Sequence, residues 1–178
     1  MKRKRNPPAA SDETPAKASS PLWFVGRFLV GLALGQIAIA WFPPLERWAI
    51  QSTLGSLRFL VWGLHLPGGV DGAFFHLGSS QVQIVGECTP LMPTLVMAAA
   101  MTAYPAPRRD QLLGIIAGAA VLWFFNLLRI GSLLAVIRWR PNSFDFVHMY
   151  LWQTITLVMV LVIFLIWLRL QRPREARA

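Results

Sequence analysis

Three side chains in the second half of the chain could together carry out nucleophilic catalysis: the thiol of Cys88, the guanidinium of Arg129 and the imidazole of His148. A thiolate can attack a carbonyl carbon while a nearby histidine moves the proton. An arginine can stabilise the oxyanion that then develops, or keep the thiolate charged. Spacing alone leaves two other readings open, a packing role for Cys88 and an interfacial position for His148.

Arg129 is the sharpest single indication of a functional site, because it stands inside an apolar segment. An arginine in a membrane span costs several kcal/mol by most estimates and normally faces a cavity or a partner. Asn126 lies one helical turn earlier on the same face and could hydrogen-bond the guanidinium. A structural ion pair between Arg129 and Glu87 is the alternative interpretation.

Asp145 precedes His148 by three residues and could orient the imidazole, although helix capping would explain an aspartate there equally well. We expect no metal and no cofactor. The single cysteine excludes an internal disulfide framework and a zinc site of the CxxC type. The sequence also lacks a Gly-rich phosphate loop and an HExxH motif.

The composition predicts a membrane protein. The chain has 178 residues, of which 55% are hydrophobic and only 14% charged, whereas soluble domains carry about a quarter charged residues. The apolar residues come in blocks, and most of the basic residues stand at the ends of those blocks. The net charge of +9 therefore indicates membrane topology rather than nucleic-acid binding.

We predict an all-α fold, a polytopic membrane helical bundle with about four transmembrane helices. Each apolar block approaches the length needed to cross a hydrocarbon core of ~30 Å. Gly114 and Gly118 have the small-xxx-small spacing of a close-packing helix face. The four predicted spans are residues 22–42, 88–104, 111–139 and 149–168.

The segments between and around the spans have different compositions. Residues 46–65 predict an amphipathic helix lying in the interface, and residues 66–87 predict a loop or short hairpin outside the membrane. Residues 1–20 are polar and rich in Pro, Ala and Ser, which predicts a disordered cytoplasmic tail. Residues 171–178 predict a basic cytoplasmic tail.

The distribution of Lys and Arg predicts the orientation in the cytoplasmic (inner) membrane. With four spans and both termini in the cytoplasm, eleven basic residues lie on the cytoplasmic side and four on the other. Arg27, near the start of the first span, can extend to the cytoplasmic surface. In this arrangement Cys88, Arg129 and His148 all lie at the extracytoplasmic face.

Four short blocks in this order resemble the exosortase/archaeosortase family of polytopic membrane cysteine transpeptidases or proteases. They are GEC at 86–88, PAPRR at 105–109, NLLRI at 126–130 and FDFVH at 144–148. The resemblance covers about residues 80–168 and implies that Cys88 is the nucleophile and that Arg129 and His148 complete the active site. It also implies a membrane-embedded exosortase-like domain over residues 21–170.

The resemblance further implies a function. Members of the family recognise a C-terminal sorting signal on exported proteins, made of a short motif, a transmembrane helix and a basic cluster, and cleave near the motif outside the membrane. Thr89 and Pro90 follow Cys88 here, where many members have Ser-Gly or another small pair. The expected partners are such tailed substrates and membrane lipids, and the oligomeric state is undetermined. Two alternatives remain: a non-catalytic membrane assembly or export subunit, and a cysteine-dependent acyl or lipid transferase.

Overall fold

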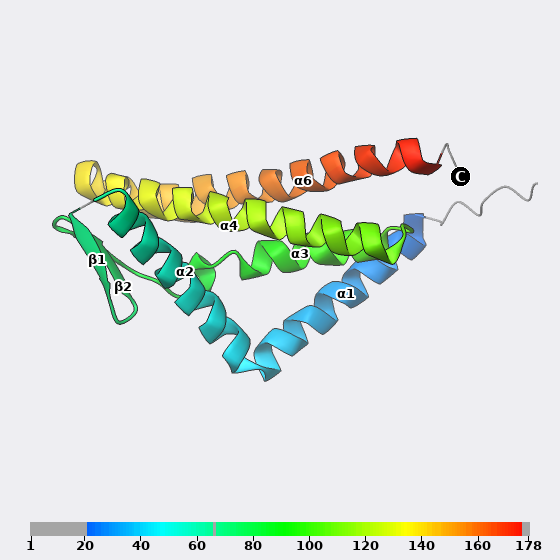
Figure 1. Cartoon of the computed structure of the whole chain (residues 1–178), viewed down its shortest axis with the longest axis horizontal. Helices are drawn as coiled ribbons and strands as arrows, with labels where there is room; N and C mark the ends of the chain where they lie inside the picture. Colours follow the sequence, from blue (N-terminus) through cyan, green and yellow to red (C-terminus); the bar gives the residue numbers. More distant parts are fainter. Residues whose placement is uncertain (1–20, 66, 176–178) are drawn as a thin grey trace, which may run out of the picture.

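The computed structural model describes residues 21–65 and 67–175. It confirms the all-α membrane bundle. Within these ranges, three helical segments are long and apolar enough to cross a membrane: Pro21–Trp41, Arg108–Trp139 and Pro141–Gln171. The first is α1 and the second is α4, and the third ends in α6, which itself covers Trp152–Glu175. Figure 1 shows α4 and α6 side by side along the long axis, with α3 beside α4.

The two ends of the described bundle bear on the two tails predicted from the sequence. The predicted tail 1–20 lies outside the described residues. At the other end, α6 continues to Glu175, so the expected basic tail over 171–178 begins inside a helix. Residues 169–172 are Arg, Leu, Gln and Arg, all good helix formers, and they continue the last helix past its apolar block.

The second predicted span, 88–104, is helical only over α3 (Leu91–Ala103). At 1.5 Å per residue its 13 residues cover about 20 Å, less than the hydrocarbon thickness. Prolines explain both ends. Pro90 occupies the N-cap position, and Tyr104 is extended because it precedes Pro105. The shortening leaves Cys88 outside α3, in a separate turn.

Pro43 and Pro44 not only end α1 but begin α2 (Pro43–Gly63), since proline is well accommodated in a first helical turn. Figure 1 shows α1 and α2 meeting at a corner, both inclined to α4. The amphipathic character predicted for residues 46–65 is confirmed. One face is buried at Ala49, Thr53, Leu54, Leu57 and Val61, while Trp48, Phe59 and Trp62 are exposed.

Residues 66–87, expected to form a loop or short hairpin, contain two successive hairpins. The strands β1 (Gly68–Asp71), β2 (Phe74–Leu77) and β3 (Ser80–Gln83) form an antiparallel sheet in that order. Gly72 and Gly78 take the positive φ values that two-residue hairpin turns require. The sheet lies at one end of the bundle, which we call the sheet end. The start of α1 and the end of α6 lie at the opposite end (Figure 1).

Gly114 and Gly118 form the close-packing face that their spacing predicts. A methyl group at Gly114 would collide with the indole of Trp167 on α6, and one at Gly118 would collide with Met97 on α3. A second pair with the same spacing, Gly31 and Gly35 on α1, packs against α3, where Leu95 fills the space beside Gly35. The glycines therefore set the distance between the helices of the bundle.

We expect Gly118→Ala to lower the stability of the protein by about 1–3 kcal/mol, because the added methyl group overpacks the contact with Met97 and Ile163. The matched control is Gly131→Ala on the same helix. Nothing lies within 4 Å of its added methyl group, so helix propensity should raise stability by up to about 1 kcal/mol. Thermal unfolding in detergent micelles measures both. Equal shifts would show that Gly118 is not a packing position.

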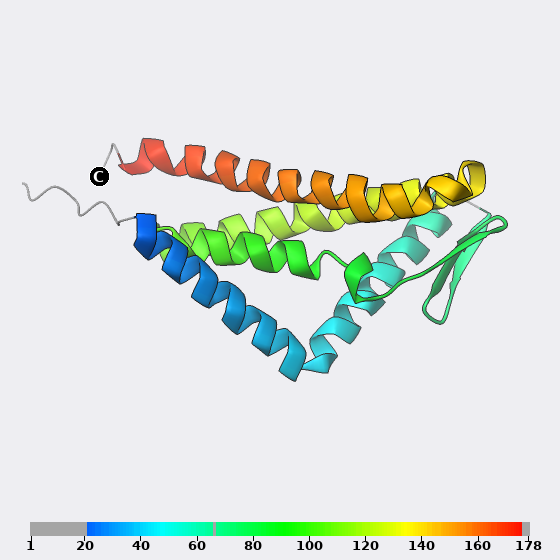
Figure 2. The ribbon, with the colours of Figure 1, turned by 180° about the vertical axis from the view of Figure 1, so that it is seen from behind.

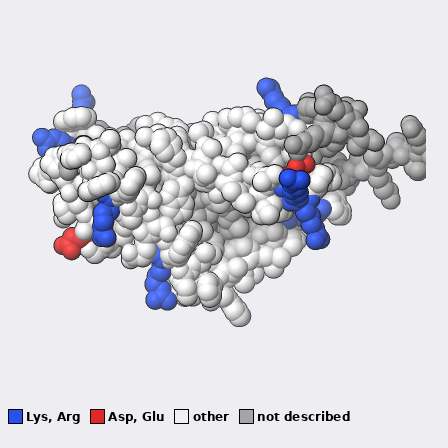
Figure 3. All heavy atoms as spheres, in the orientation of Figure 1, with Lys and Arg blue, Asp and Glu red and all other residues white. Residues whose placement is uncertain are grey.

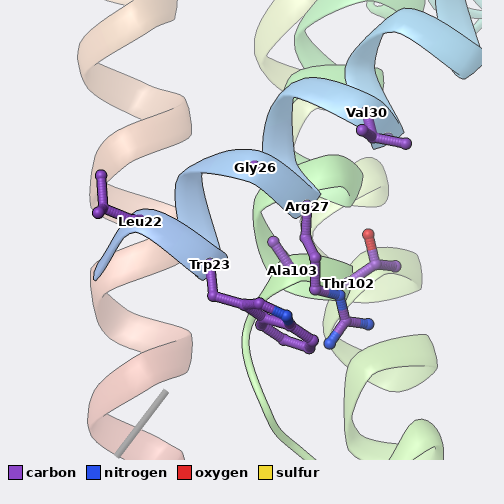
Figure 4. A pocket seen from close by; sticks show the side chains of 8 residues that line it. Leu22, Trp23, Gly26, Arg27, Val30, Thr102 and Ala103 are labelled. Carbon is purple, nitrogen blue, oxygen red and sulfur yellow. The ribbon is translucent and has the colours of Figure 1, made fainter. Parts of the chain in front are cut away.

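The distribution of charged side chains over the surface supports a bundle whose middle part is embedded in the membrane. Figure 3 shows most of the Lys, Arg, Asp and Glu side chains towards the two ends of the molecule, with largely uncharged surface between them. At the end opposite the sheet, the Arg27 guanidinium lies 4.5 Å from the ring centre of Trp23. Both side chains line a cavity of about 500 Å³ with Thr102 and Ala103 of α3 (Figure 4). This arginine–tryptophan stack suits an anchor at the membrane interface.

Candidate active site

Cys88 lies in η1 (Gly86–Cys88), a single 3-10 turn between the sheet and α3. Figure 2 shows the chain leaving the sheet as an extended segment and entering this turn. The Cys88 amide donates to the Val85 carbonyl at 2.9 Å, and the Thr89 amide to the Gly86 carbonyl at 3.0 Å. Gly86 packs against the carboxylate end of Glu46 on α2, which a side chain at this position would displace.

The thiol of Cys88 is covered, with only 8% of the residue exposed. It belongs to a buried apolar cluster to which three parts of the fold contribute. These are Leu54, Leu57 and Val61 from α2, Phe75 and Ile84 from the sheet region, and Ile130 and Leu134 from α4. The sulfur lies 3.9 Å from the carbonyl oxygen of Gln83. A substrate carbonyl therefore reaches the sulfur only after part of this cover has moved.

Asn126 fixes the backbone of Cys88. It is 5% exposed, and its Nδ2 donates to the Cys88 carbonyl oxygen at 2.7 Å. The hydrogen bond differs from the one expected with Arg129, because Asn126 faces the turn that carries the cysteine. Asn126 thus ties α4 to η1 across 38 positions of sequence.

Arg129 is the neighbour that the other two candidate residues share. Its guanidinium interacts electrostatically with Cys88 and with His148. Its Nη1 lies 3.5 Å from the backbone carbonyl oxygen of Glu87, so the contact with Glu87 involves the main chain, whereas an ion pair would use the carboxylate. Arg129 also lines a cavity of about 10 Å³, about the space of one water molecule.

His148 lies in η3 (Val147–Leu151), a π-helical turn that leads into α6. Its imidazole stacks on the ring of Phe144, with the centroids 5.4 Å apart and the planes 6° from parallel. The exposed Asp145 interacts electrostatically with the imidazole. Sequence reasoning missed Phe144, although its spacing of four residues from His148 places both rings on one helical face.

We expect Asn126→Ala to destabilise the protein by about 1–3 kcal/mol, because the buried Cys88 carbonyl loses its donor. The matched control is Asn142→Ala, at an exposed position, which should change the free energy of unfolding by less than about 0.5 kcal/mol. Denaturant or thermal unfolding in micelles gives both values. If both changes were small, Asn126 would not hold the turn.

Three separate parts of the chain thus place a thiol, a guanidinium and an imidazole near one another towards the sheet end of the bundle. Within residues 21–65 and 67–175, no group of three His, Cys, Asp or Glu side chains could hold a metal ion. The arrangement is that of a polytopic membrane protein with a covered cysteine beside an arginine on a helix that could span the membrane.

The amino-acid sequence of the chain matches one known protein family. The family model of the transmembrane exosortases matches residues 16–168. The chain therefore belongs to the transmembrane exosortase family, and it is a membrane protein of the sorting-transpeptidase class. No curated protein and no solved structure gives a significant match to it.

Proposed function

We propose that this protein is a membrane cysteine transpeptidase or peptidase that cleaves the C-terminal sorting signal of exported proteins. The signal consists of a short motif, a transmembrane helix and a basic cluster. Cleavage takes place on the extracytoplasmic side of the cytoplasmic membrane. Family membership supports this class of reaction, and the site supplies the groups that acyl transfer needs.

The observation that carries the proposal is that Arg129 interacts electrostatically with both Cys88 and His148. The three residues come from η1, α4 and η3, and no local sequence pattern brings them together. An arginine within a membrane bundle is costly unless it serves a partner or a charge. A thiolate and a developing oxyanion are both negatively charged, so the positive guanidinium of Arg129 can stabilise either of them.

The proposed reaction is acyl transfer through a thioester. The Cys88 thiolate attacks the carbonyl carbon of the scissile peptide, and a C–S bond forms while the carbonyl oxygen becomes an oxyanion beside Arg129. The C–N bond then breaks, and His148 donates a proton to the leaving amine. Water or an amine acceptor attacks the thioester and releases the thiol. Asn126 positions Cys88, and Asp145 and Phe144 position the imidazole.

The arrangement of the elements supports the proposed topology. The start of α1, the turn between α3 and α4, and the end of α6 all lie at the end opposite the sheet (Figure 1). Placing that end in the cytoplasm puts Arg108, Arg109 and Arg169 on the cytoplasmic side, in agreement with the positive-inside rule. The sheet and the proposed active site then face the extracytoplasmic side.

A second candidate, a non-catalytic assembly or export subunit, is favoured by the burial of Cys88. A cysteine that is 8% exposed among leucines and isoleucines can serve as a small packing residue. This candidate predicts that Cys88→Ser and His148→Ala leave the function of the protein unchanged. The transpeptidase predicts that both variants lose it.

Co-expression tests the proposal. Candidate substrates are proteins of the same genome that end in a shared motif, an apolar helix and an arginine cluster. Each is expressed with the wild-type chain, with Cys88→Ala and without the chain, and its intact mass is measured. We expect removal of the tail only with the wild-type chain. Removal in all three cultures, or in none for every candidate, would contradict the proposal.

A further inference from the structure

The cavity of about 500 Å³ beside Arg27 lies between the first turns of α1 and the last turn of α3, at the end of the bundle opposite the sheet. Figure 4 shows the Arg27 side chain extending from α1 towards α3, next to the indole of Trp23. The rest of the lining on α1 is apolar and consists of Leu22, Gly26, Val30 and Gly31. Arg27 is thus the charged residue of a mostly apolar cavity.

Glycines on α1 give the cavity its shape. A methyl group added at Gly26 would meet nothing within 4 Å, so the space in front of this residue is open. At Gly31 an added methyl group would lie 3.7 Å from the Cβ atom of Ala99, so α1 and α3 are in contact there. The cavity is therefore open near the start of α1 and closed by helix packing farther along.

The guanidinium of Arg27 faces this cavity without an anionic partner in the described part of the chain. Its carbon atom lies 4.5 Å from the ring centre of Trp23. Within residues 21–65 and 67–175, no carboxylate pairs with Arg27 and no oxygen accepts a hydrogen bond from it. A guanidinium carries five N–H donors in a planar fork, and a phosphate group matches that geometry. A phosphate oxygen is therefore the kind of acceptor that suits this position.

Arg27 also stands at the depth where a membrane offers phosphates. It follows Pro21, the first residue of α1, by six residues, which is about 9 Å along the helix axis. The headgroup layer on each side of a bilayer is about 5–8 Å thick, and tryptophans such as Trp23 concentrate in that layer. The guanidinium can therefore meet a lipid phosphate at the boundary between the headgroups and the hydrocarbon.

The length of the cavity favours a phospholipid as its occupant. The lining on α1 runs from Leu22 to Gly31, about 14 Å, which is about half of a hydrocarbon core of ~30 Å and so the depth of one leaflet. A membrane-spanning helix would need the full thickness. Inorganic phosphate would contact Arg27 but would leave the apolar surface of Val30 and Gly31 uncovered. One acyl chain below a phosphate group fits both parts.

The surrounding charge favours an anionic headgroup. Arg108 and Arg109 begin α4 at the same end of the bundle, and the whole chain has a net charge of +9. The ammonium group of phosphatidylethanolamine or phosphatidylcholine would be repelled there, whereas phosphatidylglycerol carries no cation. Each basic residue near an anionic lipid surface contributes about 1 kcal/mol to binding.

We infer that the cavity between α1 and α3 binds one anionic phospholipid of the phosphatidylglycerol type. Its phosphate contacts the guanidinium of Arg27, and the upper part of an acyl chain lies along Val30 and Gly31. The inference does not depend on the proposed function, because Cys88, Arg129 and His148 take no part in it.

Native mass spectrometry of the full chain in detergent micelles tests the charge preference. Dioleoyl phosphatidylglycerol and dioleoyl phosphatidylcholine are titrated in ammonium acetate of about 0.15 M, which screens charges outside the cavity. We expect the first phosphatidylglycerol to bind about fivefold more tightly than the first phosphatidylcholine, and Arg27→Gln to remove most of this difference. The matched control Arg169→Gln, exposed on α6 at the same end, should keep it.

A second pair of variants tests the cavity without changing the charge. Gly26→Leu fills the open space beside Arg27 and should abolish the tight first binding of phosphatidylglycerol. Gly55→Leu on α2 is the control, because its added methyl group also meets nothing within 4 Å and it lies outside the lining. Leucine is a better helix former than glycine, so both variants should unfold at or above the wild-type temperature, and a loss of binding would then report the cavity.

Four results would overturn the lipid site. The first two are equal affinities for the two lipids and equal losses in Arg27→Gln and Arg169→Gln. The third is displacement of phosphatidylglycerol by inorganic phosphate, which would indicate a site for a free anion. The fourth is a dimer that Gly26→Leu dissociates while no lipid is bound, which would assign the cavity to a second copy of the chain.

Discussion

Replacing Cys88 by alanine is expected to abolish processing of tailed substrates while the protein still inserts and folds. Loss of a catalytic nucleophile costs about 10⁴-fold or more in rate, because no other group in the site can form the covalent intermediate. Alanine removes only one sulfur atom from the apolar cluster, so the fold should survive. Intact mass of the substrate measures the activity, and the level of membrane-inserted protein measures the folding.

The variant Cys88→Ser distinguishes a catalytic role of Cys88 from a packing role. Serine keeps the size of the side chain, but its hydroxyl is a far weaker nucleophile than a thiolate at neutral pH. We therefore expect Cys88→Ser to be as inactive as Cys88→Ala. Full processing by the serine variant would identify Cys88 as a packing residue and would favour the non-catalytic subunit.

Arg129→Lys should reduce the rate of processing by about 10²–10³-fold, the usual cost of removing a group that stabilises an oxyanion. Lysine keeps the positive charge but lacks the planar fork of the guanidinium, which can face Cys88, His148 and the Glu87 carbonyl at once. Single-turnover rates with a purified tailed substrate in micelles measure the effect.

Arg138→Lys is the matched control for this substitution, because Arg138 is exposed on the same helix. Its rate should stay within about twofold of the wild-type rate. The double variant Cys88→Ala Arg129→Lys should be no slower than Cys88→Ala alone, since both residues act on one transition state. Normal turnover by Arg129→Lys would reduce Arg129 to a structural residue.

Local composition predicted much of the architecture. Runs of apolar residues around 22–42 and 111–139 correspond to α1 and α4, because partition into a membrane depends on the segment itself. Pro43 predicted a helix boundary for a similar reason, since a missing amide hydrogen acts on the adjacent backbone. Pro90 was expected inside the span 88–104, and the structure instead places it at the N-cap of α3. The spacing of Gly114 and Gly118 predicted a contact face, although not its partners.

Predictions about the candidate site were less complete. The residue types pointed to Cys88, Arg129 and His148, and the structure brings the three into electrostatic range. Their catalytic roles remain predictions. The bond from Asn126 to the Cys88 carbonyl and the stack of Phe144 on His148 were not foreseen. The first depends on how α4 is rotated against η1.

The sequence by itself determined that the chain is a multi-span membrane protein of the exosortase type, with one cysteine, an arginine inside an apolar segment and a histidine near the last helix. Only the tertiary structure decided that α2, the three-stranded sheet and α4 together cover the thiol, and that a groove lies between α4 and α6. Hydrophobicity and proline act on neighbouring residues and can be read in order along the chain. Burial and grooves depend on how helices distant in sequence are tilted, rotated and spaced, and the packing of whole helices against one another sets those quantities.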